Sequence, residues 1–167
     1  MNKWMFLMAL LSVVSGLVAG QQTDLKVDKF SGEWEFSKVE MKLYAQDDGR
    51  LLEDKVFTTT ESTKNINGLV PFSIKFSRHQ CIISHRNGIE GGEFRLINDK
   101  EFTFSPDVQG KENLNSTNRI PAITYRYRIE DRNWLAIDMP AAFYKDNIRG
   151  VAVRLLYTCY YQLKPVK

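Results

Sequence analysis

Two segments in the C-terminal half of the chain alternate strictly between apolar and polar positions. Every second residue of Ile123–Ile129 is isoleucine or tyrosine, and threonine and arginine fill the positions between them. Val151–Leu163 carries an apolar or aromatic residue at every odd position over its whole length. A period of two over such lengths is typical of half-buried antiparallel β-strands.

The remaining chain is a series of short apolar segments between turn residues, and none after the first 20 residues shows helical spacing. Asn87-Gly88 and Gly91-Gly92 are expected to break the chain, and residues 61–68, 106–118 and 140–150 are expected to be loops. About eight or nine strands at hairpin spacing are typical of an antiparallel barrel or sandwich. The predicted strands are Glu33–Ala45, Leu51–Thr60, Val70–Ser77, Gln80–His85, Glu93–Ile97, Glu101–Ser105, Ile120–Ile129, Trp134–Asp138 and Val151–Leu163.

The first predicted strand changes phase along its length. Trp34 and Phe36 lie on one face of an extended chain, whereas Val39 and Met41 lie on the other. A bulge or sharp bend near Ser37–Lys38 reconciles the two halves, and a bent strand of this kind helps a sheet to close. The predicted fold is therefore all-β: one antiparallel up-and-down β-barrel of about eight strands.

The first 20 residues have the layout of a secretory signal peptide. Lys3 is followed by the apolar core Trp4–Val14 and then by small residues around Ala19. This core is well short of the roughly 20 residues that a membrane-spanning helix needs. We expect a signal peptide at residues 1–20, a single domain at residues 21–167, and a secreted or periplasmic protein.

Charge and cysteine content narrow the classes of function. Lysines and arginines number 23 against 20 acidic residues, and the charges are interspersed. Nucleic-acid binding therefore gains no support, because it usually needs a clustered basic face. Cys81 and Cys159 are the two cysteines, and an isolated pair in an oxidising compartment is expected to form a disulfide bond.

No catalytic motif is found, so the sequence predicts a protein that is not an enzyme and that needs no cofactor or metal. His79 and His85 are the two histidines, and their separation is no metal-binding signature. Axial haem ligation is an alternative role for them, but a place on the surface or at a strand end is favoured. Asn115 begins a glycosylation sequon, which matters only in a eukaryotic secretory pathway.

The start of the first strand resembles the lipocalins and, more loosely, the wider calycin group. The matching residues are Phe30 and the run Gly32-Glu33-Trp34, which follow a short polar segment after the leader. The resemblance implies that Trp34 closes the floor of the barrel and that a late basic residue, Arg154, stacks on the indole. Many lipocalins also bridge a middle strand to the C-terminal region. The second lipocalin motif and the C-terminal helix are missing, so the chain looks more like a minimal lipocalin-like domain.

A closed barrel would turn part of its aromatic residues into the wall of a cavity. The leading hypothesis is a monomer that binds a small hydrophobic or amphipathic molecule without catalysis. One alternative is an interior filled by its own side chains, with the barrel a scaffold whose loops bind a protein. A barrel enzyme, and a barrel with Arg126 and Arg128 pointing inward to an anionic head group, are the less favoured alternatives. The candidate ligand-binding residues are Phe94, Phe102, Tyr125, Tyr127 and Tyr157.

Overall fold

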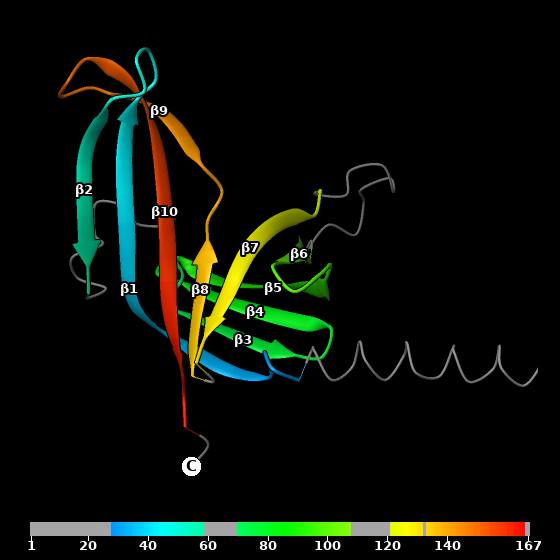
Figure 1. Cartoon of the computed structure of the whole chain (residues 1–167). Helices are drawn as coiled ribbons and strands as arrows, with labels where there is room; N and C mark the ends of the chain where they lie inside the picture. Colours follow the sequence, from blue (N-terminus) through cyan, green and yellow to red (C-terminus); the bar gives the residue numbers. More distant parts are fainter. Residues whose placement is uncertain (1–27, 59–69, 108–120, 132, 166–167) are drawn as a thin grey trace, which may run out of the picture.

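The computed structural model describes residues 28–58, 70–107, 121–131 and 133–165. These ranges contain ten β-strands and no helix (Figure 1), and so no helix in them is long and apolar enough to cross a membrane. The expected signal peptide, the sequon at Asn115 and most of the two longer loops lie outside the described residues. The strands are β1 (Gly32–Ala45), β2 (Leu51–Phe57), β3 (Ser73–Ser77), β4 (Gln80–His85), β5 (Gly88–Leu96), β6 (Glu101–Pro106), β7 (Ile123–Glu130), β8 (Trp134–Asp138), β9 (Ala142–Asp146) and β10 (Val151–Leu163).

Eight of the strands close into an antiparallel barrel. Their order is β1-β3-β4-β5-β6-β7-β8-β10, and β10 pairs with β1 to complete the ring. The predicted all-β barrel is therefore confirmed. The other two strands, β2 and β9, lie outside the ring and pair with β1 and β10 respectively.

Strand β9 corrects the prediction of a loop over residues 140–150. Ala142–Asp146 forms a hairpin with the first half of β10, in which Ala142 lies opposite Leu155. Three of its five side chains are exposed, so its residues carry no clear apolar alternation. Backbone pairing with the long strand β10, rather than a buried apolar face, holds this segment in a strand.

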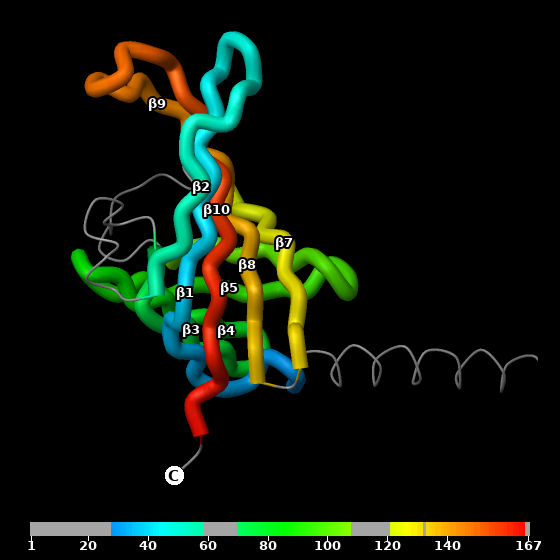
Figure 2. The backbone as a smooth tube through the Cα atoms, turned by 60° about the vertical axis from the view of Figure 1, so that its left-hand side comes forward, coloured from blue at the N-terminus to red at the C-terminus, as the bar shows by residue number. Residues whose placement is uncertain are grey.

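Strand β1 bends as the phase change predicted. Its pairing with β10 shifts register between Phe36 and Lys38, which is the mark of a bulge. The first part of β1 pairs with β3 in the barrel, and the part after the bulge pairs with β2. Beyond the barrel, β2, β1, β10 and β9 therefore continue as a four-stranded extension, which rises past the crossing strands β3 to β5 in Figure 2.

The predicted faces of the two alternating strands are confirmed. Tyr127 is buried in β7 and its neighbours Arg126 and Arg128 are exposed. On β10 the odd positions from Val153 to Tyr161 are all buried. The alternative with inward-pointing arginines is therefore wrong, because it requires the opposite face of β7 to line the barrel.

The indole of Trp34 fixes the beginning of β1 in the core. Trp34 is completely buried, and its indole Nε1–H donates a hydrogen bond of 2.8 Å to the carbonyl oxygen of Phe30. Gly32 has a φ of +133°, and a Cβ there would lie 2.8 Å from the side chain of Leu163. The positive φ selects glycine at this position, and any larger residue would also displace the end of the Leu163 side chain.

The expected stacking of Arg154 on Trp34 is wrong. Arg154 lies opposite Tyr44 in the pairing of β1 with β10, and its guanidinium carbon is 5.4 Å from the centre of that ring. Trp34 lies opposite Leu163, at the other end of both strands. The two side chains are also on different faces, because Trp34 is buried and Arg154 is exposed.

The expected chain break at Gly91-Gly92 is also wrong, since both residues lie inside β5. Gly92 is opposite Pro106 and faces the interior, where the ring of Phe104 covers its backbone. A Cβ at Gly92 would lie 2.3 Å from the carbonyl oxygen of Ser105 and 2.6 Å from Phe104. The glycine is thus required by the close approach of β6 and not by a turn.

Candidate functional site

A cavity of about 330 Å³ lies inside the barrel, bordered by β3 to β8, by β10 and by residues 139–142, which lead into β9. Its wall is mostly aliphatic and aromatic. The ionisable side chains that reach it are those of Cys81, His85, Glu90, Tyr125 and Tyr157. An apolar hollow with a few convergent polar groups is the usual form of a small-molecule site.

The register of β3 with β4 builds one wall of this cavity. Ile74 lies opposite Ile83, and Phe76 lies opposite Cys81. Directly opposed residues of an antiparallel pair point to the same face, so all four side chains reach the interior together. They are all buried and border the cavity.

Aromatic residues and β8 build the facing wall. Phe102 lies opposite Tyr125, and their rings are stacked with centroids 5.2 Å apart and planes at 18°. Ile137 of β8 and Tyr157 of β10 complete this side. The wall therefore combines flat apolar surface with two phenol hydroxyls, which suits an amphipathic ligand.

The two cavity tyrosines remain un-ionised at neutral pH. Burial, and after it the negative charge of Glu90, raises the pKa of Tyr125 to about 12. Burial likewise raises the pKa of Tyr157 above its ordinary value. Each phenol therefore keeps its proton and can both donate and accept a hydrogen bond.

Glu90 and His85 form a partly exposed polar pair at the border of the cavity. The carboxylate Oε2 of Glu90 lies 3.8 Å from Nε2 of His85, and the two side chains are 44% and 23% exposed. The other ring nitrogen of His85, Nδ1, is buried and has no hydrogen-bond partner among the described residues. This polar pair is thus more exposed to solvent than the buried apolar wall behind it.

Three of the five candidate ligand-binding residues border the cavity, namely Phe102, Tyr125 and Tyr157. Phe94 does not, because it is packed 4.8 Å from Phe76 and 5.4 Å from Phe30, measured between ring centroids. The remaining candidate is Tyr127, and two contacts hold it away from the cavity. Its hydroxyl donates to the carbonyl oxygen of Asn98 at 3.2 Å, and its ring packs against Phe30.

Glu90 is a cavity residue that the sequence did not identify, and His85 was expected on the surface or at a strand end. A signal for both was present in the phase of their strands. Glu90 is in phase with the buried Phe94, and His85 is in phase with the buried Cys81. The relation of Glu90 to Phe94 is not evident from the sequence, because Gly91 and Gly92 between them predict a break in the strand.

The expected disulfide bond is not formed, because Cys81 and Cys159 are both buried free thiols. Cys159 lies opposite Val39 on β1. Cys81 reaches β1 only through β3, where its partner Phe76 lies opposite Gly32. The two cysteines are thus on separate walls of the barrel, whereas a disulfide needs Cα atoms within about 7 Å.

Both thiols should be unreactive in the folded protein. Burial raises the pKa of Cys81 and that of Cys159 to about 12, so only about one thiol in ten thousand is ionised at pH 8. We expect no reaction with a chromogenic disulfide reagent under native conditions, and two thiols per chain in denaturant without reductant. A count of zero in denaturant would show the bridge instead.

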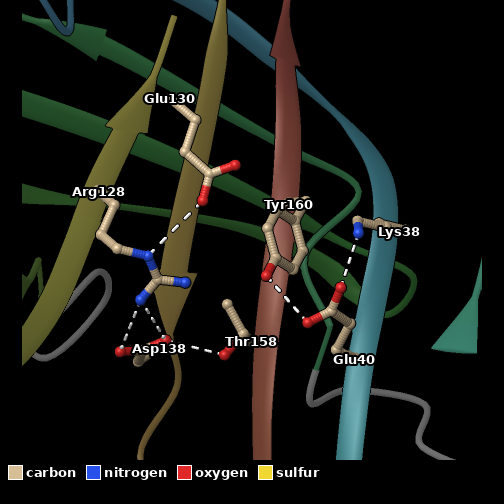
Figure 3. Close-up of polar contacts among 7 residues, drawn as sticks. All are labelled: Lys38, Glu40, Arg128, Glu130, Asp138, Thr158 and Tyr160. Atoms are coloured by element: carbon tan, nitrogen blue, oxygen red, sulfur yellow. Dashed lines mark hydrogen bonds and ion pairs between the residues drawn. The ribbon is translucent and has the colours of Figure 1, made fainter. Parts of the chain in front are cut away.

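A second group of polar side chains lies on the outer wall, across β7, β8, β10 and β1 (Figure 3). Arg128 of β7 faces Asp138 of β8 at 3.3 Å, and Thr158 of β10 donates to the same carboxylate at 2.8 Å. The hydroxyl of Tyr160 donates to Glu40 of β1 at 2.9 Å. These contacts link four consecutive strands around the closing seam of the barrel.

The acids of this outer group already have partners. Lys38 is 2.6 Å from Glu40, and hydrogen bonds from Lys38 and Tyr160 hold the pKa of Glu40 below its usual range. The ammonium of Lys38 also lies 4.3 Å from the centre of the Tyr160 ring. We interpret the outer group as structural, because its charges satisfy one another on a partly solvated face.

Within the described ranges, no three His, Cys, Asp or Glu side chains are grouped so that they could hold a metal ion. His79 is exposed in the turn between β3 and β4 and does not border the cavity. Only His85 of the two histidines contributes to the candidate site.

Comparison with known proteins assigns no family. No family model and no curated protein matches the chain. Among solved structures it is similar to a crystal structure of a mutant of the vaccine antigen Transferrin Binding Protein B from Haemophilus parasuis Hp5, with 13% identity and a TM-score of 0.33. The match covers 83% of this chain but only 29% of that one. A similarity of this level shows nothing about function.

Proposed function

We propose that this protein is a secreted, non-enzymatic, lipocalin-like binding protein that holds a small hydrophobic or amphipathic molecule in its barrel. The observation that carries the proposal is the cavity of about 330 Å³ between the two walls. A filled barrel, the main alternative, would have no such space. The cavity lies at the small end of the roughly 300–1,000 Å³ range of ligand sites.

Cavity size sets the size of the ligand. An apolar cavity of about 150 Å³ holds a molecule as large as benzene, so this one suits a ligand about twice that size. Eight buried methylene groups would contribute about 6 kcal/mol before the costs of association. A medium-length alkyl or a two-ring compound is therefore the appropriate probe.

Filling the cavity from its wall should weaken ligand binding. Ile83 borders the cavity, and an indole in its place would extend into the ligand space. We expect I83W to bind 1-octanol at least about tenfold more weakly than the wild type in isothermal titration calorimetry.

The adjacent residue provides a matched control. Ile82 is on the same strand, points outward and is 41% exposed. I82W should therefore bind 1-octanol as the wild type does. Equal binding by I83W and I82W, both folded by circular dichroism, would place the ligand outside the cavity.

A protein-interaction scaffold is the second candidate, and the four-stranded extension favours it. The outer face of this extension exposes Phe143 and Val56, at 64% and 56%, and Leu156, at 37%, lies on the same face. Phe143 and Leu156 are diagonal neighbours across β9 and β10, and exposed apolar neighbours of this kind can mark a partner site. Under this reading, I83W would leave the biological activity intact and F143S would remove it.

A further inference from the structure

Among the described residues that border the proposed ligand cavity, Glu90 is the one carboxylate and none is lysine or arginine. The register of β5 places Glu90 opposite the cavity residue Ile83, so its side chain is on the inner face of the strand. A fixed negative charge at this position would repel a carboxylate or phosphate head group and attract a cation.

The polar and apolar residues of the cavity differ in exposure, and this difference predicts the orientation of the ligand. Glu90 is 44% exposed and His85 is 23% exposed, whereas Ile74, Phe76 and Ile83 are buried. A charged head group can therefore stay partly hydrated near Glu90 while its apolar tail enters the barrel. Such an arrangement avoids the cost of burying an ammonium group completely.

Two further features near Glu90 favour an ammonium group, which is both a cation and a hydrogen-bond donor. Nδ1 of His85 is buried and unpartnered among the described residues, and Nε2 faces the Glu90 carboxylate at 3.8 Å. A proton on Nε2 leaves Nδ1 as an acceptor. The stacked pair of Tyr125 and Phe102 offers aromatic surface, which attracts cations.

We propose that this site selects small amphipathic amines, with the ammonium group beside Glu90 and the apolar tail between the two walls. This inference rests on the proposed function and specifies the chemical class of its ligand. The four features that carry it are the single carboxylate, the absence of a basic residue from the described lining, the unpartnered imidazole nitrogen and the aromatic wall.

A series of probes with one tail and three heads tests this selectivity. Octylamine, 1-octanol and octanoate would be titrated at pH 7 by calorimetry against the full chain. We expect octylamine to bind about tenfold more tightly than octanoate, with 1-octanol between them. E90Q should remove most of the preference for octylamine over octanoate.

Glu93 provides the matched control, because it lies on the same strand, faces outward and is exposed. E93Q should keep the preference of the wild type. Binding of octanoate as tight as that of octylamine, or a preference that E90Q leaves intact, would overturn the amine assignment while the cavity function stands. Failure of all three probes to bind would overturn the proposed function and the assignment with it.

Discussion

Replacing Gly92 with alanine is expected to destabilise the protein by about 3 kcal/mol, the upper end of the usual cost of overpacking. The new Cβ would lie 2.3 Å from the backbone oxygen of Ser105 and 2.6 Å from the ring of Phe104. A backbone oxygen has no free rotation by which to move away, so β5 and β6 must separate. Urea denaturation of G92A and of the wild type would measure the change in the free energy of unfolding.

The neighbouring glycine makes this prediction specific to position 92. The nearest atom to a Cβ at Gly91 is a carboxylate oxygen of Asp107 at 3.7 Å, which is an ordinary contact. G91A should therefore change the stability by no more than about 0.5 kcal/mol. Equal stability of G92A and G91A would show that β5 and β6 are not packed as described.

Replacing Trp34 with alanine should have the second large effect, about 3–5 kcal/mol. The indole is completely buried and is bonded through Nε1 to the carbonyl oxygen of Phe30. Its removal would leave a cavity at the start of β1 and an unpaired buried carbonyl group. Since small domains are stable by roughly 5–15 kcal/mol, W34A should be partly unfolded at moderate temperature.

Two comparisons separate the packing and hydrogen-bond contributions of Trp34. W34F keeps much of the apolar volume but lacks the donor, so it should lose about 1–3 kcal/mol. W134A removes a half-buried tryptophan from β8 and should cost less than W34A in thermal or urea unfolding. A W34A protein as stable as W134A would contradict the buried role of Trp34.

The sequence could predict those parts of the fold in which one strand face is buried over a long stretch. The alternation in β7 and β10 identified their inner faces, and the phase change in β1 located the bulge after Phe36. These signals are local, because the period of an extended chain assigns successive side chains to opposite faces. The order of β3 to β8 follows the chain, whereas the pairings β1–β3, β8–β10 and β1–β10 join strands that are not consecutive.

Features that depend on contacts between strands could not be predicted in this way. Glycine is common in turns, but Gly92 lies inside a strand, where the close approach of the Phe104 ring requires a residue without a side chain. An oxidising compartment would allow a disulfide bond between the two cysteines. The strand register, however, places Cys81 and Cys159 on different walls of the barrel. Arg154 is late in the chain, as the lipocalin resemblance requires, but it lies opposite Tyr44.

The candidate site was predictable only in part for the same reason. Aromatic residues on inward faces are expected to line a cavity, and Tyr125 and Tyr157 do so. Which inward aromatic residues pack against one another depends on their height in the barrel. Phe94 and Tyr127 lie beside Phe30, at a level that the sequence alone does not specify.

The most direct test of ligand binding inside the barrel is an NMR titration of isoleucine methyl groups with 1-octanol. Ile74, Ile83 and Ile137 border the cavity, whereas Ile82 and Ile89 are 41% and 77% exposed. Binding in the cavity predicts saturable shifts of the first three methyl signals and none of the other two. Shifts confined to Ile82 and Ile89, or no shifts at all, would contradict it.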